Sequence, residues 1–146
     1  MKNFKKHPIN MVSIFPLCLS IKANVEPNPL EGVKVPYSLK TASSKYDKEN
    51  KIISVKVKFE IADGKGDKEQ QPPFVMFVEL MARFKVDDSA FPMDKIDDWA
   101  KRNAPIIIYP YLREHVYALT LRAGFMPMLL PLVEVPTFKI EQPQNS

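Results

Sequence analysis

The side chains that could support acid–base, nucleophilic or metal chemistry are few, and their spacing favours none of these. One cysteine, Cys18, and two distant histidines, His7 and His115, are too few to predict a metal site. Cys18 with His115 is the one possible nucleophile pair, but a small buried thiol and an unrelated helix histidine are the simpler interpretation. Asp97 and Asp98 are adjacent and would point in different directions on a helix, which makes a poor acid–base pair. The sequence therefore predicts neither an enzyme nor a cofactor.

Composition and charge indicate one soluble domain and exclude several classes of partner. The 146 residues, 45% hydrophobic and 26% charged, are ordinary for a globular protein with a modest core. The net charge of +4 includes no long run of like charges, so no nucleic-acid role is predicted. The four glycines form no phosphate-binding loop. No apolar stretch approaches the ~20 residues of a membrane-spanning helix. We therefore expect a protein without membrane insertion, in the reducing cytoplasm that a single cysteine fits.

Lys2 to Lys6 followed by the apolar residues 11–21 imitate a signal peptide, but residues 9–21 are better interpreted as a strand. Pro16 interrupts the run, and its side chains alternate with a period of two. The residues in front of it, 1–8, are expected to form a flexible N-terminus. The alternating set is Ile9, Met11, Ser13, Phe15, Leu17, Leu19 and Ile21.

Three further strands are predicted at residues 33–41, 53–61 and 74–86. The strand at 53–61 alternates strictly between apolar and polar side chains, as a strand with one wet face does. The first half of 74–86 is apolar on both sides, so we expect Val75 and Phe77 to be covered by another subunit. The connections between the four strands are too short for crossover helices, which predicts an antiparallel meander.

A helical pattern follows the last strand. Residues 94–102 predict a short helix that is acidic at its start and basic at its end. Asn103 is placed to cap a second helix at 104–123, with a kink or break at Pro110 and Gly124 as its terminator. The proline-cut segment after it must lie extended against the rest of the molecule. The chain is thus predicted to be a single α+β domain over residues 1–146.

Two parts of the sequence carry a resemblance to a known family. The segment Asn103-Ala-Pro-Ile-Ile-Ile-Tyr-Pro-Tyr-Leu-Arg-Glu-His115, followed by Arg122-Ala-Gly-Phe125, is similar to the residues that open and close the long helix of SecB chaperones. Leu39-Lys-Thr-Ala-Ser-Ser44 resembles the turn between the second and third strands of that family. The order of the elements also agrees, so the resemblance covers most of the chain.

The resemblance to SecB implies a four-stranded antiparallel sheet with a long helix, assembled as a homotetramer that is a dimer of dimers. It also implies a holdase that keeps unfolded or precursor polypeptides in apolar grooves and delivers them to the SecA motor for protein export. By this resemblance the client-binding groove comprises Tyr37, Leu39, Tyr117, Leu121, Phe125, Met128 and Leu130. The oligomer interface comprises the helix residues Ile108, Leu112, Val116 and Leu119, together with Val75 and Phe77.

Three features depart from the SecB pattern and keep alternatives open. The chain is net positive, whereas SecB proteins that serve SecA are typically acidic, and their acidic SecA-docking stretch aligns with the uncharged residues 75–77. Pro136 and Pro143 leave no room for the family's second helix, so residues 137–146 are expected to form a tail without it. One alternative is a chaperone dedicated to a single partner, such as the antitoxin of a toxin–antitoxin system. Another is a structural oligomer or a small-ligand carrier that uses the same groove.

Overall fold

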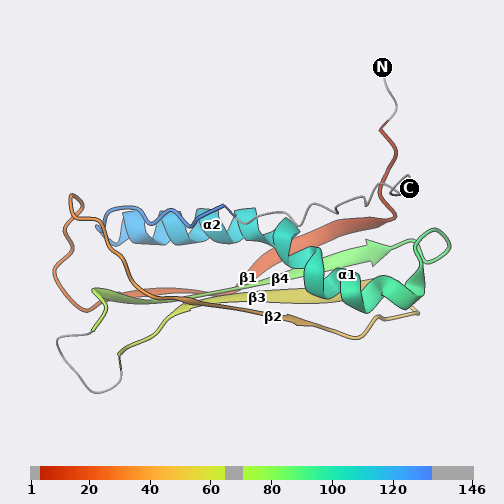
Figure 1. Ribbon diagram of the computed structural model, residues 1–146, viewed down its shortest axis with the longest axis horizontal. Coiled ribbons are helices and arrows are strands. Elements are labelled where there is room, and N and C mark those ends of the chain that lie inside the picture. Colours follow the sequence, from red (N-terminus) through yellow and green to blue (C-terminus); the bar gives the residue numbers. More distant parts are fainter. Residues whose placement is uncertain (1–3, 65–70, 133–146) are drawn as a thin grey trace, which may run out of the picture.

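The computed structural model describes residues 4–64 and 71–132, which form one antiparallel sheet with helices along one face (Figure 1). The α+β class predicted from the sequence, with a four-stranded antiparallel sheet and one long helix, is confirmed. Residues 1–3 of the predicted flexible N-terminus and the predicted tail at 137–146 lie outside the described residues. The strands are β1 (Ile9–Ala23), β2 (Ser38–Ser43), β3 (Ile52–Ile61) and β4 (Phe74–Val86). A 3-10 turn, η2 (Met93–Lys95), leads into α1 (Ile96–Arg102), and α2 (Ala104–Arg122) follows.

The order of the strands differs from the predicted meander. β2, β3 and β4 follow one another as antiparallel neighbours, but β1 pairs with β4, which gives the order β1-β4-β3-β2. The cause is the connection at 24–37, which is too long and too rich in proline for a tight hairpin and carries the chain to the far edge of the sheet. The strand predicted at 33–41 begins only at Ser38, because its first part belongs to this connection. The result is a Greek-key arrangement with β1 and β2 as edges.

β1 stays paired along its whole length because it contains two bulges. Its register with β4 skips one residue at Val12 and another at Leu17, and both side chains are exposed. Each bulge exchanges the faces of the residues that follow, so Phe15 lies on the opposite face of the sheet from Met11. The single alternation predicted over 9–21 is therefore wrong, although the strand itself is confirmed. Pro16 is tolerated because β1 is an edge strand.

The core lies between the helices and one face of β3 and β4. Alternate residues of both strands are buried there, and the largest fully buried side chains are Phe59, Phe74 and Phe84. Trp99 of α1 meets Phe84 edge-on, with 5.0 Å between the ring centroids, which places α1 on this face of the sheet. The opposite face of the sheet carries the polar half of the β3 alternation, as the sequence predicts.

The helix residues that were predicted to form an oligomer interface belong to this core instead. Ile108, Leu112 and Val116 are fully buried, with 0% exposure, in one cluster with the sheet residues of their own chain. Leu119 is half-buried against the same cluster. For Ile108, Leu112 and Val116 the prediction was wrong, because α2 is apolar on both sides and the resemblance did not tell which side meets the sheet. For Leu119 it stays a prediction.

α2 runs as one helix past Pro110, so the expected break does not occur. Pro110 is exposed, and water can take the place of the hydrogen bond donor that a proline lacks. Asn103 precedes the helix as expected, but its side chain makes no capping hydrogen bond.

Gly124 ends α2, as the sequence predicts, in a left-handed conformation with φ +90°. Its N–H donates to the Leu121 carbonyl at 3.1 Å, and the Phe125 N–H donates to the Thr120 carbonyl at 3.1 Å. These two bonds form a Schellman cap, which satisfies carbonyl groups at the helix end and turns the chain back.

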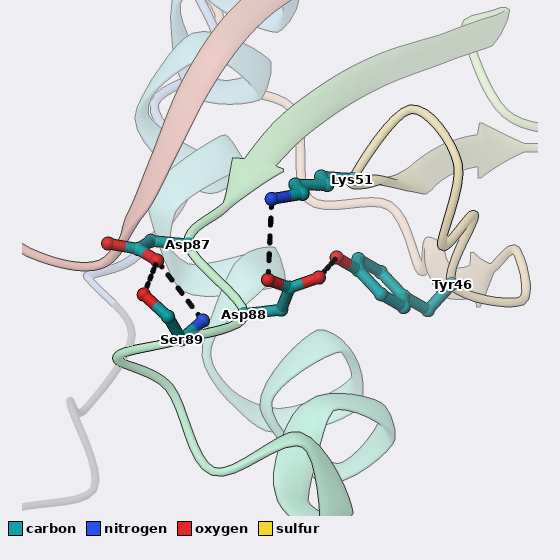
Figure 2. A network of polar contacts seen from close by, with 5 residues as sticks. All are labelled: Tyr46, Lys51, Asp87, Asp88 and Ser89. Atoms are coloured by element: carbon teal, nitrogen blue, oxygen red, sulfur yellow. Dashed lines mark hydrogen bonds and ion pairs between the residues drawn. The ribbon is translucent and has the colours of Figure 1, made fainter.

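A polar network ties the β2–β3 connection to the chain that leaves β4 (Figure 2). The Asp88 carboxylate accepts a hydrogen bond from the Tyr46 hydroxyl at 3.2 Å and pairs with the Lys51 ammonium at 3.5 Å. Beside it, the Ser89 hydroxyl donates to Asp87 at 2.6 Å, and this bond holds the pKa of Asp87 below its usual value. Burial, followed by the nearby Asp88 carboxylate, raises the pKa of Tyr46. The network holds the chain that leaves β4 against the β2–β3 connection, just before the first helical turn begins.

Gly124→Ala should lower the free energy of unfolding by about 1–2 kcal/mol, because the left-handed conformation penalises a side chain. The new Cβ would also lie 3.2 Å from the Cβ of Pro27. Gly32→Ala is the matched control, since its closest contact would be the Met126 sulfur at an ordinary 3.6 Å. Urea unfolding followed by Trp99 fluorescence measures both variants. Equal midpoints for the two would contradict this account of the turn.

Candidate functional site

The chain after Gly124 returns along α2 as an extended segment, residues 125–132, that two α2 side chains hold by its backbone. The Met128 N–H donates to the Thr120 hydroxyl oxygen at 2.9 Å, and the Arg113 guanidinium donates to the Leu130 carbonyl at 3.0 Å. The Thr120 hydroxyl itself donates to the carbonyl of Val116 one turn back, at 2.8 Å, so this buried group is satisfied. Side chains of α2 provide these hydrogen-bond partners because the prolines of the segment lack an N–H, so the segment cannot pair with a neighbouring strand as a regular strand does.

Tyr109 makes the third contact of this kind. Its hydroxyl donates to the Pro131 carbonyl. Burial is the main cause that raises the pKa of Tyr109, so the phenol stays protonated and able to donate at neutral pH. The return segment is therefore anchored at Met128, at Leu130 and at Pro131, and its outward side chains have defined positions.

A second extended segment, residues 32–37 of the β1–β2 connection, lies opposite the return segment. Val33, Val35 and Tyr37 are half-buried against the core, and the Tyr37 ring lies 5.1 Å from the Phe59 ring between centroids. The two segments are the walls of a cavity of about 480 Å³, which we call the groove. Its lining is Gly32, Val33, Lys34, Val35, Pro36 and Tyr37 on one wall, and Met126, Pro127, Met128, Leu129, Leu130 and Pro131 on the other.

A smaller hollow of about 340 Å³ adjoins the groove and shares residues 32–35 with it. Phe125 lies at its base, with its ring centroid 4.7 Å from that of the core residue Phe74. Segment 32–35 is thus open on two sides. Its backbone, and that of residues 36 and 37, makes no backbone–backbone hydrogen bond to any other described residue.

The structure brings together only some of the residues that the resemblance nominated for client binding. Tyr37, Met128 and Leu130 line the groove, and Phe125 lines the adjoining hollow. Leu39 is exposed on the edge strand β2. Tyr117 and Leu121 line neither space, because they lie on the outer side of α2 with 43% and 54% exposure.

Four further residues line the groove that were not predicted for this site, namely Val33, Val35, Met126 and Leu129. Their signals were present, since Val33 and Val35 alternate with Tyr37, and Met126 and Leu129 belong to the apolar run after the helix. Val75 and Phe77 are half-buried on the sheet face away from the helices, and their contact with another subunit stays a prediction.

The groove offers apolar contacts and backbone groups rather than reactive side chains. Lys34 is the one charged residue among its lining residues. Cys18 faces the outer side of the sheet opposite Glu79, whereas His115 belongs to α2, so the sheet separates the thiol from the imidazole. Within the described ranges, no three His, Cys, Asp or Glu side chains are grouped to hold a metal ion. None of the described helices is long and apolar enough to cross a membrane.

Tyr109→Phe should loosen the return segment, because it removes the donor to the Pro131 carbonyl. We expect a loss of about 1 kcal/mol in unfolding free energy and faster amide hydrogen exchange at Met128 and Leu129. Tyr111→Phe is the matched control, since Tyr111 is 40% exposed on the other side of the helix. Hydrogen exchange read by mass spectrometry compares the two variants. The account of the anchored wall is contradicted if both leave exchange in 125–132 unchanged.

Comparisons with known proteins agree with this architecture. The protein-family model described as preprotein translocase subunit SecB matches residues 5–143, which is nearly the whole chain. A curated relative, an uncharacterized protein of Methanocaldococcus jannaschii, is 29% identical over 86 residues, 59% of this chain. The chain spans about half of that relative's length, 52%.

A solved structure has the same fold. It is the Mycobacterium tuberculosis SecB-like chaperone Rv1957, in complex with a peptide from the HigA1 antitoxin. The similarity has a TM-score of 0.71 at 20% identity, and it covers 88% of this chain and 93% of that chain. The long stretch matched by the family model, residues 5–143, decides the assignment: the chain belongs to the SecB family.

Proposed function

We propose that this protein is a chaperone of the holdase type, which binds unfolded or precursor polypeptides in the groove between residues 32–37 and 126–131. The observation that supports this most is the combination of an apolar lining with a wall of extended backbone that has no backbone partner among the described residues. An unfolded client presents the complementary features, namely apolar side chains and unpaired N–H and C=O groups. It can therefore bind as an added strand with side chains in the cavity.

The chemistry of the groove suits clients of many sequences. Burial of apolar area contributes about 25 cal/mol per Å², and this contribution depends little on which apolar side chain supplies the area. The two methionines of the lining, Met126 and Met128, have flexible side chains that adapt to differently shaped partners. Binding to the unfolded state alone pulls the folding equilibrium of the client toward it, which is how a holdase prevents aggregation. No step of this function needs a catalytic residue or a cofactor.

Membership of the SecB family favours a role in protein export in the cytoplasm, with precursor proteins as clients and SecA as the receiving motor. A second candidate is a chaperone dedicated to one partner, such as an antitoxin. The complex of the similar M. tuberculosis chaperone with an antitoxin peptide supports this candidate. Residues 75–77 are uncharged where the SecB pattern has its acidic SecA-docking stretch, which also favours the dedicated chaperone over delivery to SecA. Client range separates the two candidates, because a dedicated chaperone protects its partner and not unrelated clients.

We further propose that the outer side of α2 is an inter-subunit surface of a tetramer. Ile107, Tyr111, Tyr117 and Leu121 lie on this side and are 40–54% exposed. Large apolar side chains on the uncovered side of a helix indicate a partner there, although Glu114 and Arg122 of α2 are also exposed, and the sheet covers only the inner side. This surface replaces the interface that the resemblance to SecB placed at Ile108, Leu112 and Val116, which are buried in the chain's own core.

Leu129→Glu should weaken client binding about ten-fold or more, because it places a charge in an apolar groove where a leucine contributes about 1.5–3 kcal/mol of burial. Leu129 is 67% exposed in the free protein, so the fold should tolerate the change. Leu30→Glu is the matched control, since Leu30 is 88% exposed and is not among the lining residues. Light scattering of a chemically unfolded client, diluted into each variant, measures the protection. If the wild-type protein in molar excess leaves aggregation of every client unchanged, the holdase proposal fails.

The double variant Tyr111→Glu with Leu121→Glu should lower the particle mass from that of a tetramer of 16.7 kDa chains to that of a smaller species. Charges on two apolar positions oppose their burial between subunits. Val25→Glu is a control of equal exposure, because Val25 and Leu121 are both 54% exposed. Size-exclusion chromatography with multi-angle light scattering gives the masses. An unchanged mass in the double variant would remove α2 from the interface.

A further inference from the structure

The face of the sheet that points away from the helices is strongly basic. Every second side chain of β3 and β4 lies on this face, because side chains alternate along a strand. The strand registers show which residues of β1 and β2 lie on the same face. Six cationic side chains share it with two carboxylates. The cations are Lys22, Lys40, Lys56, Lys58, Arg83 and Lys85, and the carboxylates are Glu60 and Glu79.

Two of these cations are placed against each other. Lys40 on β2 is the direct register partner of Lys58 on β3, and like charges directly opposite on neighbouring strands destabilise a sheet. Among the described ion pairs, only the one between Lys58 and Glu60, at 3.8 Å, involves a cation of this face. Repulsion of this kind lowers stability without a benefit inside the fold, and an anionic partner would relieve it.

The same face carries an apolar strip beside the cations. Phe77 and Met81 on β4, with Phe15 on β1, are half-buried in the uncovered face. The Lys58 ammonium lies 4.6 Å from the centroid of the Phe77 ring, and the Arg83 guanidinium lies 5.2 Å from that of Phe15. Apolar contacts and positive charge therefore alternate within the reach of one extended peptide.

We propose that this basic sheet face binds an acidic polypeptide segment of a partner protein, one whose carboxylates are interspersed with apolar side chains. Carboxylates would pair with Lys40, Lys56 and Arg83, and apolar side chains would cover Met81, over which no cation lies among the described contacts. Charge complementarity of this kind steers association and selects the partner. The site is distinct from the groove, because the sheet lies between them, so a client and the acidic partner can be bound together.

Other occupants fit the face less well. The same face of a second copy would bring two basic faces together, and like charges oppose that contact. The subunit contact predicted at Val75 and Phe77 would therefore have to come from another surface of the second copy. Single-stranded nucleic acid binds to such sheets by stacking bases on open aromatic faces, but here cations lie over the rings of Phe77 and Phe15. The carboxylates of Glu60 and Glu79, within the face, would also repel phosphate groups. An acidic peptide can place its apolar residues beside these two carboxylates.

The proposal is tested with a fluorescein-labelled synthetic peptide in which aspartate and leucine alternate, and anisotropy gives its affinity for the full chain. We expect binding that weakens as salt is raised and that falls about ten-fold in Lys56→Glu. Lys40→Glu should weaken binding similarly while it raises the urea midpoint, because it converts a like-charge pair into an attractive one. A stabilised variant that binds less well excludes misfolding as the cause.

Lys101→Glu is the matched control, since it makes the same charge change on an exposed residue of α1, outside this face. It should leave peptide affinity within about two-fold of the wild type, as expected for an exposed charge distant from the site. Equal losses in Lys101→Glu and Lys40→Glu would overturn the proposal, because they would show attraction to net charge alone. Tighter binding of oligouridylate, or of vesicles that contain phosphatidylglycerol, through the same lysines would also overturn it. Leu129→Glu should leave this affinity unchanged, which separates the site from the groove.

Discussion

The turn at Gly124 determines where both walls of the groove lie. Its left-handed backbone sends the chain back along α2, and the absence of a side chain lets Pro27 of the β1–β2 connection approach closely. The proline-cut return segment cannot satisfy its own backbone, so α2 supplies partners through Thr120, Arg113 and Tyr109. The connection at 24–37 crosses to the far edge of the sheet and provides the opposite wall. Without the turn, the groove would have one wall and no enclosed volume.

The molecule presents three surfaces with different physical chemistry. The groove is apolar with exposed backbone, the outer side of α2 is apolar with helical spacing, and the sheet face away from the helices is basic. Each type of surface suits a different partner: an extended unfolded chain, another helix of the same kind, and an acidic segment. Because the sheet and α2 separate them, these contacts need not compete. Three incompletely covered surfaces on one small domain are what the proposed binding function requires.

Local pattern predicted the elements of the fold well. The strict alternation at 53–61, the apolar run at 74–86 and the stop at Gly124 each correspond to an element of the structure. Those signals depend on neighbouring residues alone. The predicted pairing of β1 with β2 was wrong, because the order of the strands depends on the path of the long connection between them. The assignment of Ile108 to an oligomer interface was also wrong, because both sides of α2 are apolar and Ile108 and Ile107 look alike in sequence.

The candidate groove could be predicted only in part, because it also depends on contacts between residues that are distant in the sequence. Tyr37, Met128 and Leu130 were nominated and do line it, but Tyr117 and Leu121 do not. The groove forms where residues about 95 positions apart lie opposite each other, and no local periodicity contains that information. The basic sheet face could not be predicted from the sequence, because its cations are dispersed along the chain and gather only through strand pairing.

We propose that an unfolded client pairs with the open backbone of residues 33–37. Hydrogen exchange with and without a saturating unfolded client tests it directly, since the N–H groups of Val33, Lys34, Val35 and Tyr37 have no backbone partner among the described residues. We predict strong slowing of exchange at 33–37, with additional slowing in 126–131 across the groove. Unchanged exchange at 33–37, together with client-dependent slowing confined to another surface, would contradict the account.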